Sequence, residues 1–170
     1  MSDIKVPKGK TIKAVFTMLP GRNIPTTSKH KWDKQANVQA AVEKLVKGKS
    51  LLVTTKMGKS LKTDYTAYES CDLICVADYK TPAEALAAAK SKEIWILGSE
   101  DLLVEYKSVI SEIHLVRVDA PNNKTNMKTC KEGLGIRPRV EGFIPNAPAI
   151  RQEADSDNKY VTVQRVLKRR

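Results

Sequence analysis

The sequence predicts an α/β protein, a three-layer sandwich of helices around a mostly parallel central sheet with an antiparallel strand at its C-terminal edge. Short apolar runs at 11–18, 50–55, 71–77, 93–97 and 113–120 have the length and composition of buried strands. Amphipathic segments separate the runs. This alternation is typical of parallel sheets that are covered by helices on both faces.

The first strand, Thr11–Met18, ends at the turn signal Leu19-Pro20-Gly21. Apolar residues then recur at helical spacing between Asp33, a suitable N-cap, and Lys47, and Gly48 provides a stop. We therefore expect a helix between Asp33 and Lys47.

The basic stretch Lys56–Lys62 follows the second strand and is either the start of a short helix or an exposed turn. Thr81 and Pro82 are a strong helix start, with a capping hydroxyl followed by proline at the first helical position. Ser99 is a suitable N-cap for a further helix between the strands 93–97 and 113–120. A crossover of this length predicts that these two strands are parallel neighbours.

We expect a single domain over 1–170. Residues 1–10 are predicted to be a basic, loosely held arm. Residues 121–158 are rich in Gly, Pro and Asn and predict a long irregular excursion that holds at most one irregular strand. The run Tyr160–Leu167 is the strand that returns antiparallel to the sheet edge.

The formal net charge of +11, from 30 Lys and Arg against 19 Asp and Glu, favours anionic partners such as nucleic acid, a phosphorylated cofactor or an acidic protein surface. The aromatic content of 5% argues against a base-stacking platform. No apolar run approaches the roughly 20 residues that span a bilayer, and the N-terminus lacks the apolar core of a secretory signal, so we expect a cytoplasmic protein. Cys71, Cys75 and Cys130 are expected to be free thiols, and no metal site is expected.

Several strings, in their order along the chain, resemble dihydrofolate reductase over residues 11–120 and 159–170. Lys49–Leu61 is similar to the strand and helix that carry that family's Gly-Arg-x-Thr cofactor signature. Thr81–Leu86 resembles its helix before the central strand, and Ile94–Ser99 takes the place of its Ile-Gly-Gly turn. Glu112–Leu115 and the terminal strand also fit. The resemblance implies the fold of that family and a binding site for NADPH.

The chain departs from the family at the residues that carry its chemistry. The resemblance implies a carboxylate on the first helix that promotes protonation of the substrate, yet the best alignment places Asn37 or Val38 there, and Asp33 lies about one helical turn earlier. The cofactor signature has become Thr54-Thr55-Lys56-Met57, and the paired glycines have become Gly98-Ser99. These losses indicate a scaffold without catalytic residues and without a cofactor, because catalysis tolerates far less change than a fold does.

The first functional hypothesis is therefore a noncatalytic, strongly basic protein, such as a virus-encoded or accessory factor, that binds nucleic acid or an acidic protein partner. The candidate anion-binding residues are Arg22, Lys29, Lys31, Lys34, Lys56, Lys59, Lys62, Arg137, Arg139, Lys168, Arg169 and Arg170. Of these, Arg22, Lys56 and Lys59 are expected to share one rim, at the carboxyl ends of the strands.

Two alternatives stay open. One is a divergent NADPH-dependent reductase that binds the cofactor at Thr55, Lys56, Gly98 and Ser99, with Asp33 as the substitute proton source. The other is a structural subunit of a larger assembly, whose segment 121–158 folds against a neighbour.

Overall fold

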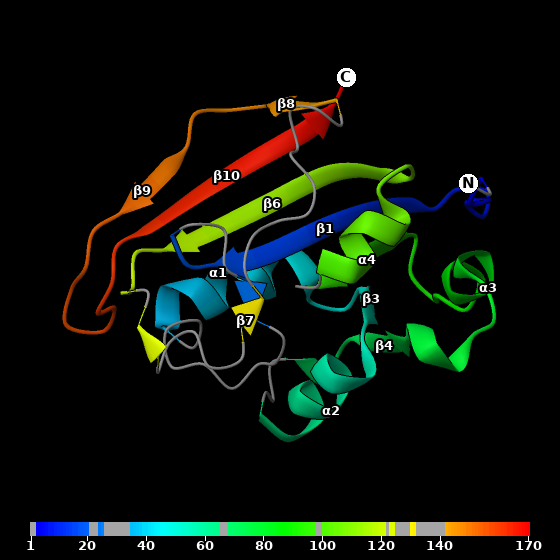
Figure 1. Ribbon diagram of the computed structural model, residues 1–170, viewed down its shortest axis with the longest axis horizontal. Helices are drawn as coiled ribbons and strands as arrows, with labels where there is room; N and C mark the ends of the chain where they lie inside the picture. Colours follow the sequence, from blue (N-terminus) through cyan, green and yellow to red (C-terminus); the bar gives the residue numbers. More distant parts are fainter. Residues whose placement is uncertain are drawn as a thin grey trace.

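The computed structural model describes residues 3–20, 24–25, 35–64, 68–97, 100–121, 123–124, 130–131 and 142–170. The parallel part of its sheet consists of β1 (Thr11–Met18), β3 (Ser50–Val53), β4 (Asp72–Cys75), β5 (Glu93–Leu97) and β6 (Ile110–Val118). β10 (Thr162–Arg169) runs antiparallel to β6, and β8 (Phe143–Pro145) and β9 (Ile150–Gln152) pair with its other edge. Within the described residues these strands form one eight-stranded sheet of order β4-β3-β5-β1-β6-β10-β8, with β9 also on β10 (Figure 1). The predicted fold class is confirmed.

Helices cover both faces of the sheet. α1 (Ala36–Val46) and α2 (Thr55–Asp64) pack on one face, whereas α3 (Pro82–Ala87) and α4 (Glu100–Tyr106) pack on the other. Successive strand residues divide between the two layers, as the two-residue period of a strand requires. The clearest case is β3, in which Leu51 joins the cluster around α1 and α2 and Leu52 joins the cluster around α3 and α4.

β1 lies between β5 and β6, and it is parallel to both. The prediction that the strands at 93–97 and 113–120 are neighbours is therefore wrong. The chain leaves β5, passes through α4 and enters β6 on the far side of β1, so the crossover spans two sheet positions. The apolar content of β1 fits this central place, because a strand with a neighbour on each side and a helix layer on each face is largely buried.

The predicted N-caps of α3 and α1 have different outcomes. α3 begins as predicted, with the Thr81 hydroxyl accepting a hydrogen bond from the Glu84 amide and Pro82 in the first turn, although it ends at Ala87. The N-cap of α1 is Gln35, so the prediction of Asp33 is wrong; Asp33 lies outside the described residues. Gln35 makes no side-chain capping bond, because its amide group binds the backbone of Tyr160, just before β10, instead.

The N-terminal arm is attached to the fold. Ile4 and Val6 pack against the core cluster of α3 and α4, and the Lys10 ammonium donates to the carbonyl oxygens of Ala89, at 2.5 Å, and Ser91, at 2.9 Å. The expectation of a loosely held arm is therefore wrong for these residues. The position of the Lys10 ammonium group beside the C-terminus of α3 is favourable, because the free carbonyls of a helix C-terminus attract cations.

The segment 121–158 holds more regular structure than predicted. Its described residues include β8, β9 and the short strand β7 (Cys130–Lys131), which pairs with β2 (Ile24–Pro25). The prediction of at most one irregular strand is wrong. These strands are only two or three residues long, and β7 and β8 pair with strands that are distant in the sequence, so local patterns do not reveal them. None of the described helices is long and apolar enough to cross a membrane.

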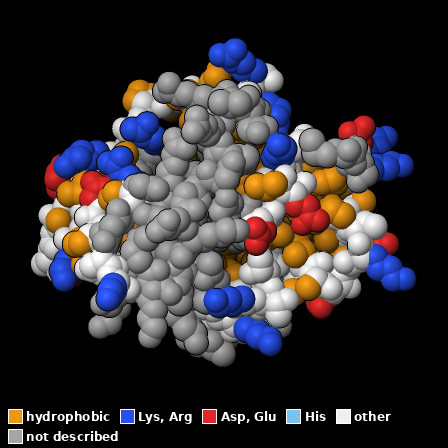
Figure 2. All heavy atoms as spheres, in the orientation of Figure 1, with side chains coloured by type: hydrophobic (Ala, Val, Ile, Leu, Met, Phe, Trp, Pro, Cys, Tyr) orange, Lys and Arg blue, Asp and Glu red, His pale blue; other side chains and the backbone are white. Residues whose placement is uncertain are grey.

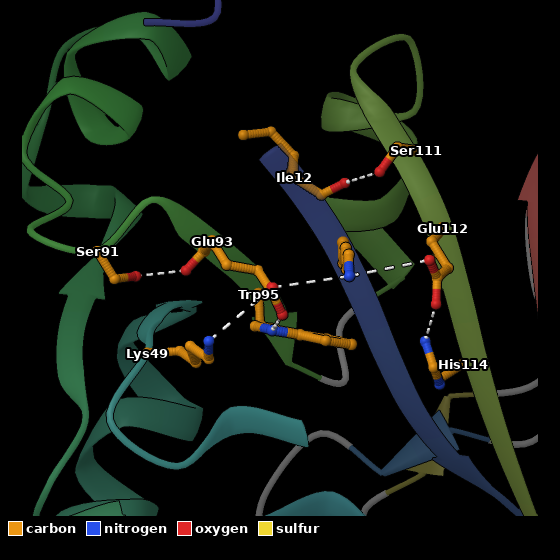
Figure 3. Close-up of polar contacts among 9 residues, drawn as sticks. Ile12, Lys49, Ser91, Glu93, Trp95, Ser111, Glu112 and His114 are labelled. Carbon is orange, nitrogen blue, oxygen red and sulfur yellow. Dashed lines mark hydrogen bonds and ion pairs between the residues drawn. The ribbon is translucent and has the colours of Figure 1, made fainter. Parts of the chain in front are cut away.

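A polar cluster lies on the α1 side of the sheet, toward the amino ends of β1, β5 and β6 (Figure 3). Lys13 Nζ is 3.7 Å from Glu93 Oε2 and 3.9 Å from Glu112 Oε2. Lys49 Nζ is 3.9 Å from the same oxygen of Glu93. The register explains the grouping, because Lys13 pairs with Trp95 on β5 and with Glu112 on β6. Each carboxylate is thus compensated by a lysine.

His114 completes this cluster. Its side chain is 15% exposed, its Nε2 forms a hydrogen bond with Glu112, and its ring meets Trp95 edge-on with centroids 5.1 Å apart. Burial lowers the pKa of His114 below its ordinary value despite the opposing effect of Glu112, and Lys13 lowers it further. His114 is therefore neutral at pH 7, and its Nε2–H donates to the Glu112 carboxylate.

The lowered pKa of His114 gives the stability of the protein a predictable pH dependence. An unfolded histidine has a pKa of about 6.5. The unfolded chain therefore binds this proton more readily, and the free energy of unfolding is expected to decrease as the pH falls below that value. One histidine contributes at most about 1.4 kcal/mol per pH unit. Urea unfolding between about pH 5.5 and 7.5, where ordinary carboxylates stay ionised, measures the slope.

Two variants identify the source of that slope. His114→Gln should flatten the dependence, whereas His30→Gln, which removes the other histidine, should keep the part of the slope that His114 contributes. A slope in His114→Gln equal to that of the unmodified chain would show that His114 is not the group responsible.

Candidate functional site

In open α/β sheets, ligand sites lie at the carboxyl ends of the parallel strands. At this rim the structure describes the start of α1, after β1, and the start of α2, after β3. It also describes Cys75, the last residue of β4. Gly98 and Ser99, which follow β5, lie outside the described residues. The candidate site is therefore built from the first turns of α1 and α2.

The first turn of α1 directs an apolar side chain, that of Val38, toward the sheet. Val38 is 1% exposed and packs in an apolar cluster with Leu19 from the end of β1 and Val116 and Val118 from β6. This is one of the two positions to which the resemblance assigns the reductase acid. A valine side chain has no proton to give and no lone pair to accept one, so this position contributes packing and no acid–base chemistry.

The neighbouring amides face β10. Gln35 is 7% exposed; its Nε2 donates to the Tyr160 carbonyl at 2.8 Å, and the Tyr160 amide donates to its Oε1 at 2.7 Å. Asn37 Nδ2 donates to Thr162 Oγ1 at 3.2 Å, and the Asn37 amide donates to Asn158 Oδ1 at 2.8 Å. These amides bind the start of β10 to the start of α1, and amides do not ionise near neutral pH.

The first turn of α2 has donors that suit a phosphate. The Thr54 hydroxyl accepts from the Met57 amide at 3.2 Å, which caps the helix. Thr55 and Lys56 are exposed in the first turn, and the Thr55 hydroxyl lies 3.3 Å from Cys75 Sγ. Gly58 lets the helix approach β3, since a Cβ there would stand 3.2 Å from Val53 Cγ2. A helix N-terminus with a lysine and a threonine fits the chemistry of a phosphate group.

The structure places the predicted basic residues in two separate groups. Lys56 and Lys59 are exposed on α2, at the carboxyl ends of the parallel strands. Lys168 and Arg170 are exposed at the carboxyl end of β10. Because β10 is antiparallel to β6, this end lies beside the amino ends of the parallel strands, at the edge of the sheet opposite to α2. β5, β1 and β6 lie between β3 and β10. Lys62 belongs to α2, but its side chain is outside the described part of the chain. The other predicted residues outside it are Arg22, Lys29, Lys31, Lys34, Arg137 and Arg139.

Arg169 has a structural role. Its Nε donates to the Ile110 carbonyl at 2.9 Å, its Nη2 donates to the Lys107 carbonyl, and its guanidinium lies 4.5 Å from the centre of the Phe143 ring. The side chain thereby connects the end of β10 to the turn between α4 and β6 and to β8. An anion would have to compete with these contacts for Arg169.

Basic side chains on one face of the molecule are dispersed. Figure 2 shows Lys and Arg around the rim of this face, interspersed with acidic and apolar side chains, with no continuous basic patch in the coloured area. The described cations on this face therefore present separate positive points rather than one groove.

Cys71 and Cys75 are free thiols. Cys71 Sγ donates to the Val46 carbonyl at 3.2 Å, and burial raises the pKa of its thiol. Among the described residues, no three His, Cys, Asp or Glu side chains lie close enough together to hold a metal ion.

Sequence reasoning missed both polar networks, the Gln35–Asn37 contacts with β10 and the cluster of Lys13 with His114. Gln35 and Tyr160 are 125 residues apart, and no local spacing connects them. The alternation of Lys13, Glu93 and Glu112 with apolar neighbours was the available signal, since it indicates polar side chains on an otherwise buried sheet face.

No family model matches the sequence, and no curated protein matches it. Solved structures do match. One is a dihydrofolate reductase from Enterococcus faecalis, solved in complex with NADP(H) and RAB-propyl, which superposes with a TM-score of 0.67 at 13% sequence identity. The match covers 95% of this chain and 97% of the reductase chain, so it extends over nearly all of both chains. The chain therefore has a dihydrofolate reductase-like fold.

Proposed function

We propose that this chain is a noncatalytic, basic accessory protein on a dihydrofolate reductase-like scaffold, and that it binds nucleic acid or an acidic protein surface. The observation that carries the proposal is Val38, whose side chain lies in an apolar cluster in the first turn of α1. A reductase of this fold needs a proton donor beside its substrate. The other aligned position, Asn37, is an amide that is hydrogen-bonded to β10.

The net charge of +11 supports an anionic partner. Lys56 and Lys59 are exposed at the rim where this fold class binds its ligands, beside the start of α2. Phosphate groups and carboxylates are both attracted to this combination of lysines and helix N-terminus. This rim is therefore the anion-binding surface that we assign to the protein.

The proposal predicts that dihydrofolate-dependent oxidation of NADPH is absent. A positioned acid contributes about 10²–10⁴-fold to such a reaction. Turnover by this chain is therefore expected to be at least roughly 100-fold slower than that of the Enterococcus faecalis reductase assayed in parallel. The decrease in NADPH absorbance, with thermal unfolding to verify that the chain is folded, provides the measurement.

Replacement of Asp33 tests whether any turnover that is observed depends on this carboxylate. Appreciable turnover that Asp33→Asn abolishes, and that the matched Asp3→Asn variant retains, would identify Asp33 as a proton source and would overturn the noncatalytic assignment.

A second candidate function, an NADPH-dependent reductase, is favoured by the first turn of α2. Thr55 and Lys56 offer a hydroxyl and an ammonium group at a helix N-terminus, which fits a cofactor phosphate. When bound, the nicotinamide would supply hydride. Lys56 would hold the phosphate as a point charge, without the bidentate contact that an arginine makes.

Anion binding is predicted to depend on Lys56. Affinity for labelled single-stranded and duplex oligonucleotides should fall steeply between about 50 and 200 mM salt, because bound phosphates release counterions. Lys56→Glu should weaken binding and lower the slope of log K against log salt by about one. Fluorescence anisotropy measures both quantities. Lys168→Glu, at the opposite end of the sheet, makes the same charge change and should have the smaller effect.

Two competitors separate the possible ligands. Polyglutamate represents an acidic protein surface, and NADPH represents the cofactor of the second candidate function. Displacement by NADPH, lost in Lys56→Glu, would favour the reductase. Absence of binding to oligonucleotides and to polyglutamate alike would contradict the proposal.

A further inference from the structure

The outer edge of the sheet carries an exposed strand. β9 pairs with β10 through Gln152↔Thr162, Arg151↔Val163 and Ile150↔Gln164. Among the described residues, no strand pairs with the other edge of β9 (Figure 1). All three of its residues are exposed, and Ile150 is 60% exposed. Its outward backbone groups can therefore accept another strand.

The hairpin connection over residues 153–161 holds this edge in place. The Asp155 amide donates to the Asn158 carbonyl at 2.8 Å, which closes the turn between β9 and β10. The Asp155 carboxylate accepts from the amides of Asp157 and Asn158, at 2.8 Å each. The Asn158 side-chain oxygen in turn accepts from the Asn37 amide at the start of α1. The edge is thus pre-organised, which reduces the entropy cost of pairing.

The edge sequence Ile150-Arg151-Gln152-Glu153-Ala154 is complementary to itself. In an antiparallel pair of two copies centred on Gln152, Arg151 of each copy lies opposite Glu153 of the other, and Ile150 lies opposite Ala154. Within one copy, Arg151 Nε already donates to Glu153 Oε1 at 2.7 Å, so the two side chains share a face of the hairpin. Opposite charges directly across a strand pair are stabilising, and like charges are destabilising.

We propose that two copies of this chain associate by antiparallel pairing of β9 with β9 about a two-fold axis at Gln152, which makes one continuous sheet. This interaction surface goes beyond the proposed function and does not depend on it. The pairing also covers Ile150, the most exposed of the large apolar side chains that the structure describes. Pro148 precedes the strand and lacks an amide proton, so it limits the pairing to the short segment that follows.

Charge reversal tests this register. Arg151→Glu places Glu opposite Glu, and Glu153→Arg places Arg opposite Arg, so each variant alone should associate roughly tenfold more weakly than the unmodified chain. An equimolar mixture of the two variants restores both opposite-charge pairs and should associate as the unmodified chain does. Sedimentation equilibrium of the full chain, at physiological salt, measures the dissociation constants.

The two variants control for each other. Arg151→Glu lowers the net charge and Glu153→Arg raises it, so an effect of overall repulsion would give them opposite signs, whereas strand pairing gives them the same sign. Both positions are exposed, and circular dichroism checks that both variants fold. A monomeric unmodified chain up to roughly millimolar concentration, single variants that associate normally, or a mixture no stronger than its components would each overturn the proposal.

Discussion

The structure depends on the burial of β1. Ile12, Ala14 and Phe16 enter the core on the side of α3 and α4, whereas Val15 enters the core on the side of α1 and α2. Each of them is at most 1% exposed. A strand buried on both faces must also have its backbone groups paired on both edges. β5 and β6 provide that pairing, and their parallel direction requires a helical connection over the sheet.

α1 couples this core to the candidate site. α1 packs against Val15 through Val42 and Val46. The start of the same helix, with Gln35 and Val38, lies at the rim where ligands bind in this fold class. The start of the helix is used for packing through Val38 and for binding Tyr160, just before β10, through Gln35. Both interactions stabilise the fold. The Val38 side chain therefore contributes packing at this position and no acid–base group.

Several charged side chains of this protein are used within the fold. Lys13 and Lys49 compensate Glu93 and Glu112 within the sheet, and Arg169 is bound to backbone carbonyls. The hairpin turn that follows β9 is acidic. Short-range ion pairs therefore connect neighbouring strands in this protein, and Lys56 and Lys59 are exposed on α2.

The sequence by itself determined the elements whose causes are local. Thr11–Met18 was predicted to within its observed bounds because a run of apolar and β-branched residues has few alternatives. The start of α3 was predicted because Thr81 and Pro82 act on their immediate neighbours. The antiparallel C-terminal strand and the layered architecture followed from the alternation of such elements.

The tertiary structure alone decided what depends on distant partners. The place of β1 between β5 and β6, the pairing of β8 with β10, and the contact of Gln35 with Tyr160 join segments that no spacing relates. The candidate site belongs to this second class: which of Asn37 and Val38 turns toward the sheet is set by how α1 lies against β6 and β10. Local patterns specify which face of an element is apolar, but the partner for that face is chosen by the packing of the whole chain.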